Sequence, residues 1–113
     1  KLLRCRAENG HVDLNDLTRQ LGELQISGVL IEGGGTLHWS ALAAGIVSKV
    51  QVYIAPKLVG GAAAKPPIGG QGFDKMNDAL PVTASRLTML GDDLLWEGYL
   101  QNGEGGADTC SPD

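Results

Sequence analysis

The chain lacks the features by which membrane, secreted and nucleic-acid-binding proteins are usually known. No apolar stretch approaches the ~20 residues that a membrane-spanning helix needs, and the first residues have no apolar signal-peptide core. The net charge is −4, and Lys and Arg are scattered rather than gathered into a basic stripe. Nucleic acids and anionic membranes attract such a stripe. We therefore expect a cytoplasmic protein that binds neither.

Cysteine is scarce, with Cys5 and Cys110 near opposite ends of the chain. Neither has a CxxC neighbour or a histidine at metal-ligand spacing, so the sequence predicts no zinc site and no other metal site. A disulfide between the two stays open. Free thiols are favoured because there is no cysteine-rich framework.

Aromatic residues are also few, with two Trp, two Tyr and one Phe, so Leu, Val, Ile and Ala must build the core. Apolar residues make up 42% of the chain, which is enough for a globular fold. A length of 113 residues predicts one small domain or a piece of one. The 17 glycines are clustered, which indicates backbone turns with a purpose.

The first part of the chain is expected to alternate strands and helices. Four leucines recur at helical spacing from Leu14 and predict a helix that ends near residues 22–25, with Asp13 as its N-cap. A short strand over residues 2–6 precedes it. Val-Leu-Ile at residues 29–31 is a short apolar run after a helix, which favours a buried parallel strand.

A second helix is expected over residues 37–44, with Thr36 as N-cap and Gly45 as the left-handed residue after its end. The long Gly/Ala/Pro loop that comes later, residues 60–72, has no helical or strand period, and loops of this length are often functional. The remaining expected elements are a strand over 49–55, a helical turn over 74–79, and strands over 82–90 and 94–100 that flank a hairpin turn at 91–93.

These elements predict an α/β fold of order β-α-β-α-β followed by an antiparallel hairpin. Alternating strands and helices imply parallel pairing with right-handed crossovers. Ligands bind beyond the carboxyl ends of parallel strands. Glu32, the following glycines and Lys57 should lie at that edge, and Lys57 is a candidate anion contact.

The run Glu-Gly-Gly-Gly-Thr at residues 32–36 is the strongest functional candidate. Glycines that lead into a helix allow close approach to its free amides and its partial positive charge, which suits a phosphate or pyrophosphate. The run is neither a GxGxxG fingerprint nor a P-loop. The alternative is a turn that only lets the helix pack on a sheet.

Two linked motifs extend this interpretation: Glu-Gly-Gly-Gly-Thr-Leu at residues 32–37, and Ala-Pro-Lys-Leu-Val-Gly-Gly at residues 55–61. Together they resemble the C-terminal reductase domain of the bifunctional riboflavin-biosynthesis deaminase/reductase family, over nearly the whole chain up to about Leu100. The resemblance implies a dihydrofolate-reductase-like fold. Residues 1–100 would be the C-terminal part of a reductase domain, and residues 101–113 a flexible tail.

The resemblance also implies a reaction. NADPH would transfer a hydride to the ribose C1′ of 5-amino-6-(5-phosphoribosylamino)uracil, with Glu32 contacting the substrate through its ribose hydroxyls. No protein nucleophile is required. The residues implied to line the NADPH phosphates and adjoining ribose are Gly34, Gly35, Thr36, Leu37, His38, Trp39 and Ser40.

The family usually carries an N-terminal zinc deaminase domain and a longer reductase domain than this chain. We therefore expect a fragment with cut sheet edges that self-associates into a homo-oligomer. Two alternatives stay open: a dihydrofolate-reductase-like enzyme with another pyrimidine or pterin substrate, and a non-catalytic nucleotide-binding scaffold. His38 as a catalytic acid is disfavoured, and Glu32 as a plain strand-end acid is the alternative to a ligand-binding role.

Overall fold

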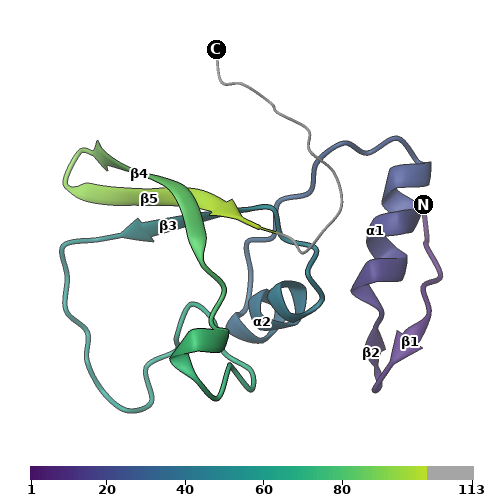
Figure 1. Ribbon diagram of the computed structural model, residues 1–113, viewed down its shortest axis with the longest axis horizontal. Helices are drawn as coiled ribbons and strands as arrows, with labels where there is room; N and C mark the ends of the chain where they lie inside the picture. The colour runs from purple at the N-terminus through teal and green to yellow at the C-terminus, as the bar shows by residue number, and fades with distance from the viewer. Residues whose placement is uncertain (102–113) are drawn as a thin grey trace.

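The structure is a computed structural model that describes residues 1–101. Figure 1 shows a small hairpin beside the first helix and a separate sheet near the second. No helix in this described part is long and apolar enough to cross a membrane. The expected tail at 101–113 falls, apart from its first residue, outside the described residues, as does Cys110.

The N-terminal hairpin pairs β1 (Ala7–Glu8) with β2 (His11–Val12) in antiparallel fashion. Asn9 and Gly10 between them both have positive φ, as a tight two-residue hairpin turn requires. The strand predicted over residues 2–6 is wrong, because that segment forms no ladder with any described strand. It runs instead beside the first helix, held by hydrogen bonds with the side chains of Asp16 and Gln20 and by the Asp13 backbone amide.

Helix α1 (Leu14–Glu23) confirms its prediction at both ends. The Asp13 carboxylate accepts the Asp16 amide at 3.0 Å, which caps an otherwise unsatisfied donor of the first turn. Leu24 is the C-cap, and Gln25 with a φ of 60° turns the chain away. The leucine stripe is only partly covered, since Leu24 is 38% exposed.

The predicted buried strand at residues 29–31 is also wrong. The segment has no ladder, and Val29 and Leu30 are 60% and 72% exposed. A strand exists only through the hydrogen bonds of a neighbour, and no described strand lies beside this one. Residues 29–31 therefore have the composition of a buried strand, but the described part of the chain offers no neighbouring strand for them to pair with.

Helix α2 (Gly35–Ala43) begins earlier than the predicted start at residue 37. Its N-cap is Gly34, so the expectation of Thr36 as N-cap is wrong. Gly34 has a φ of 78°, which lets the chain enter the helix abruptly. The other end matches the prediction: Gly45 has a φ of 69°, and Ile46 donates to the Ala41 carbonyl in a Schellman arrangement.

The main sheet has three strands in the order β3-β5-β4, namely β3 (Lys49–Ile54), β4 (Val82–Leu90) and β5 (Asp93–Leu100). Every described pairing is antiparallel, so the parallel pairing expected from element order is wrong. The β4–β5 hairpin is confirmed, but β5 then lies at the centre and pairs with β3 as well. A 3-10 turn, η1 (Met76–Asp78), confirms the helical turn predicted before β4. The fold of the described part is thus mixed α/β with antiparallel sheets.

The apolar faces of this fold are largely uncovered. Among residues 1–101, Ala41 and Leu95 are the only hydrophobic side chains that are buried. The sheet exposes large side chains on both outer strands: Tyr53, Ile54, Leu87, Met89 and Leu90. A folded domain normally buries such residues, so these faces are suited to further contacts.

Candidate functional site

The glycine turn before α2 is open on the side where a ligand would approach. A Cβ added to Gly33 or Gly34 would meet no atom within 4 Å. Gly34 needs its positive φ, whereas Gly33 has an ordinary one. The space around the turn could therefore be filled by a ligand.

Three backbone amides that follow these glycines have no recorded acceptor among the described residues: those of Gly35, Thr36 and Leu37. The next amide, that of His38, donates to the Gly34 carbonyl at 3.0 Å and closes the first helical turn. Gly34 offers no side-chain cap. Free amides together with the positive end of the helix dipole favour an anion here.

The His38 amide therefore already has an acceptor within the chain, unlike the three amides before it. The reason is the earlier helix start, which places His38 inside the first hydrogen-bonded turn. Its ring instead lies against the long loop, with Nδ1 2.8 Å from the Pro67 carbonyl oxygen.

The loop that follows β3 returns beside α2 (Figure 1). The Gly69 amide donates to the Gly35 carbonyl at 2.9 Å. A Cβ on Gly35 would lie 2.9 Å from the Pro66 carbonyl oxygen, so backbone meets backbone here. Pro66 and Gly69 were not predicted to lie at the site. The only signal for their contact with α2 is the cluster of prolines and glycines in this loop.

Trp39 and Ser40, both expected near the cofactor, are already engaged. The Trp39 ring covers Gly70, where an added Cβ would be 2.0 Å from its Cδ1, and it meets Phe73 edge-on at 5.1 Å between centroids. The Ser40 hydroxyl donates to the Thr36 carbonyl at 3.0 Å. Trp39 thus fastens the loop to the helix.

Glu32 lies just before the turn and is exposed. No hydrogen bond or ion pair is found for its carboxylate among the described residues, so it is available to a ligand. Lys57 is exposed too, and no hydrogen bond or ion pair joins it to the turn. The structure therefore places Glu32 next to the glycines, whereas no hydrogen bond or ion pair is recorded between Lys57 and the turn.

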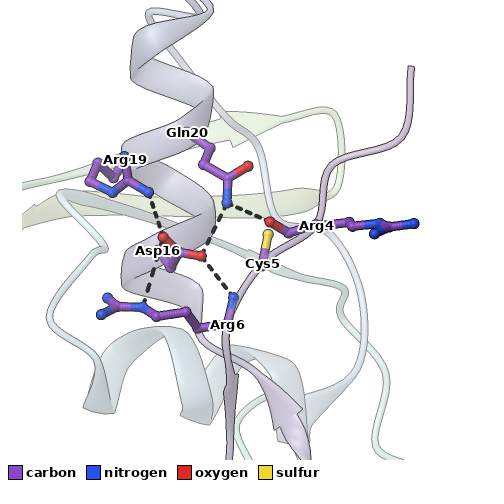
Figure 2. A pocket seen from close by; sticks show the side chains of 6 residues that line it. All are labelled: Arg4, Cys5, Arg6, Asp16, Arg19 and Gln20. Carbon is purple, nitrogen blue, oxygen red and sulfur yellow. Dashed lines mark hydrogen bonds and ion pairs between the residues drawn. The ribbon is translucent and has the colours of Figure 1, made fainter.

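A separate hollow of about 630 Å³ lies between the N-terminal segment and α1 (Figure 2). Asp16 at its base accepts the Arg6 amide at 2.8 Å, the Gln20 amide group at 3.0 Å and the Arg19 guanidinium at 2.7 Å. The Arg19 guanidinium, followed by the Arg6 amide, lowers the pKa of Asp16 to about 2.

Several groups of this network are paired with one another, because Asp16 forms an ion pair with Arg19 and Gln20 also donates to the Arg4 carbonyl. The polar groups of this hollow hold the chain together rather than face a ligand. No cluster of three His, Cys, Asp or Glu suited to a metal ion occurs among residues 1–101. The glycine turn is the better candidate site.

Known proteins similar to this chain point to one family. Residues 1–96 match the family described as the RibD C-terminal domain. A riboflavin biosynthesis protein RibD from Actinobacillus pleuropneumoniae is 49% identical over 94 residues, covering 83% of this chain and 25% of that protein. A RibD protein from Synechocystis is 46% identical over 72 residues, covering 64% and 20%.

An archaeal protein from Methanothermobacter thermautotrophicus, named 2,5-diamino-6-ribosylamino-4(3H)-pyrimidinone 5′-phosphate reductase, is 41% identical over 100 residues. The match covers 84% of this chain and 46% of that protein. The chain thus spans less than half the length of each of these relatives. Since the family match extends over most of the sequence, the chain belongs to the RibD C-terminal domain family.

Proposed function

We propose that this chain is part of a reductase of riboflavin biosynthesis, which reduces a pyrimidine ribosylamino phosphate with NADPH. Membership of the RibD C-terminal domain family supports the activity. The observation in the structure that carries the proposal is the glycine turn, where open space around Gly33 and Gly34 is followed by three amides with no recorded acceptor.

The residues present fit the cofactor. A Cβ would occupy the space beside Gly33 and Gly34, and the amides of Gly35, Thr36 and Leu37 could hold a pyrophosphate at the helix N-terminus. The nicotinamide supplies the hydride when it is bound. Three of the residues expected around the cofactor would not touch the phosphates. His38 and Trp39 would instead hold the loop against α2, and Ser40 would bond within the helix.

Glu32 is our candidate for the substrate contact. It is exposed, lies next to the turn and has no described partner. A carboxylate accepts hydrogen bonds from two neighbouring hydroxyls, which the ribose of the substrate offers. Binding there would orient C1′ toward the cofactor. Holding the two reactants in the correct orientation is a main way in which an enzyme accelerates hydride transfer.

The substrate class follows from the relatives. The archaeal relative is named for a diamino-pyrimidinone phosphate, whereas the family resemblance implies the aminouracil, 5-amino-6-(5-phosphoribosylamino)uracil. The two differ in the ring, and both offer the same ribosylamino phosphate to Glu32 and the turn. We propose the aminouracil as substrate because the family resemblance implies it, and because two RibD relatives are 49% and 46% identical to this chain.

We further propose that residues 1–100 form the C-terminal part of a dihydrofolate-reductase-like domain, preceded in the parent protein by the rest of that domain and by a deaminase domain. The exposed apolar side chains of the sheet and of Val29 and Leu30 are consistent with a domain that continues in additional chain. The cytoplasmic location expected from composition stays a prediction.

The test is a reductase assay that follows NADPH absorbance with three substrates supplied in parallel: the aminouracil, the diamino-pyrimidinone and dihydrofolate. We expect oxidation with the aminouracil. A Glu32→Gln variant should raise KM for the aminouracil and leave NADPH affinity unchanged, and Glu8→Gln serves as an exposed control.

Turnover with dihydrofolate alone would support a different pterin-type reductase. Binding of NADPH with no turnover of any substrate, even after the remaining half of the domain is added, would mean a nucleotide-binding scaffold. Either result contradicts the proposed activity.

A further inference from the structure

We propose that residues 66–70, here called the strap, hold the N-terminus of α2 in the conformation that receives the cofactor, and that His38 is the positioning residue of this device. The inference rests on the proposed function, since the ligand positioned is NADPH.

The strap meets the first turn of α2 through two hydrogen bonds. The Gly69 amide donates to the Gly35 carbonyl at 2.9 Å, and His38 Nδ1 lies 2.8 Å from the Pro67 carbonyl oxygen. A carbonyl oxygen can only accept, so Nδ1 must carry the hydrogen and donate it. Both bonds join segments far apart in the sequence.

Two glycines permit this close approach. A Cβ on Gly35 would lie 2.9 Å from the Pro66 carbonyl oxygen, and one on Gly70 would lie 2.0 Å from Cδ1 of Trp39. Any larger residue would push the strap away from the helix. Gly35 and Gly70 therefore allow the strap to pack closely against α2. A loose surface loop would not need glycine at these positions.

The strap uses acceptors and side chains of the helix and leaves its donors free. It engages the Gly35 carbonyl and the His38 and Trp39 rings, while the amides of Gly35, Thr36 and Leu37 keep no recorded acceptor. A turn fixed in this way does not have to be ordered when a phosphate arrives. Ordering costs binding free energy, so a preformed turn binds more tightly.

The experiment compares four forms of the full chain: unchanged, His38→Ala, His38→Asn and His11→Ala. Asparagine keeps an N–H donor close to the position of Nδ1, and His11, exposed in β2, is the matched histidine control. Hydrogen exchange at the Gly69 amide, measured by NMR without cofactor, reports on the strap itself. Fluorescence titration with NADPH reports on positioning.

We expect His38→Ala to speed Gly69 exchange and to raise the NADPH Kd by roughly 3- to 10-fold, as the loss of one hydrogen bond allows. His38→Asn should restore most of the slow Gly69 exchange and most of the NADPH affinity, and His11→Ala should change neither of these quantities. A faster Gly69 exchange with unchanged NADPH affinity would overturn the inference and leave the proposed function intact. Absence of NADPH binding by the unchanged chain would overturn both.

A second pair of variants guards against a general loss of folding. Gly70→Ala and Gly72→Ala impose the same backbone strain, because their φ values are 71° and 70°. Only the Cβ on Gly70 meets Trp39, whereas the Cβ on Gly72 meets nothing within 4 Å. We expect weaker NADPH binding in Gly70→Ala alone, and equal affinities in the two variants would contradict the role of the strap.

Discussion

The backbone amide of Arg6 donates a 2.8 Å hydrogen bond to Oδ2 of Asp16, which lies in the first turn of α1. The same carboxylate accepts the Arg19 guanidinium, and Asp16 is 4% exposed. One carboxylate therefore joins the N-terminal segment to the helix, although that segment forms no ladder with a described strand.

The stability of the chain should depend on the ionisation of Asp16 at low pH. Its neighbours lower the pKa from the usual 3.8 to about 2 in the folded chain. A lowered folded-state pKa means that the carboxylate stabilises the fold above about pH 4, and that this contribution is lost as pH falls toward 2. Urea unfolding of the unchanged chain and of Asp16→Asn should give free energies that differ at pH 6 and converge near pH 2.

The control for that series is Glu8→Gln, which alters an exposed carboxylate with no recorded partner in the described structure. It should match the unchanged chain throughout. A constant gap between Asp16→Asn and the unchanged chain from pH 6 to pH 2 would contradict the lowered pKa.

Alanine at Gly98 and at Gly22 should have opposite effects on stability. A Cβ on Gly98 in β5 would lie 2.4 Å from Val82 Cγ1 and 3.0 Å from the Thr83 carbonyl oxygen, so Gly98→Ala should destabilise the sheet by ~1–3 kcal/mol. Gly22 lies in α1 with open space around it, so Gly22→Ala should stabilise the helix by about 0.5–1 kcal/mol. Thermal melts compare the two, and a shift of Tm in the same direction for both would be inconsistent with this packing.

The exposed sheet should make the isolated chain self-associate. Leu87 and Met89 lie on one face of the outer strand β4 and are 65% and 60% exposed. Charges on an outer strand suppress pairing with other chains. Light scattering should find oligomers for the unchanged chain and smaller species for Leu87→Lys. Thr88→Lys carries the same charge on the opposite face and should have less effect. A uniform monomer at all concentrations would show this prediction to be wrong.

The parts of the fold that local sequence determines were predictable. The Asp13 cap, the leucine spacing of α1, the Schellman ending at Gly45 and the hairpin of β4 and β5 depend on residues close in sequence, although β5 begins at Asp93, one residue earlier than predicted. Pairing depends on distant partners instead. Residues 2–6 and 29–31 have strand-like composition, but the described chain gives them no neighbour to pair with.

The candidate site divides in the same way. The motif at residues 32–36 predicted an open turn with free amides, and the structure has one. The start of α2 was misplaced because Thr36 is a good cap by residue type, whereas the positive φ of Gly34 decides the geometry. The contact of His38 with Pro67 joins residues 29 positions apart, and no local pattern encodes it.

The most direct test of the proposed function is the affinity for NADPH of Gly34→Ala compared with Gly45→Ala. Both glycines have positive φ, 78° and 69°, and open space around them, so alanine imposes similar strain at the two ends of α2. Fluorescence titration should give a Kd at least roughly tenfold higher for Gly34→Ala, the loss of one or more phosphate contacts, and an unchanged Kd for Gly45→Ala. Equal affinities in the two variants would contradict a cofactor site at the glycine turn.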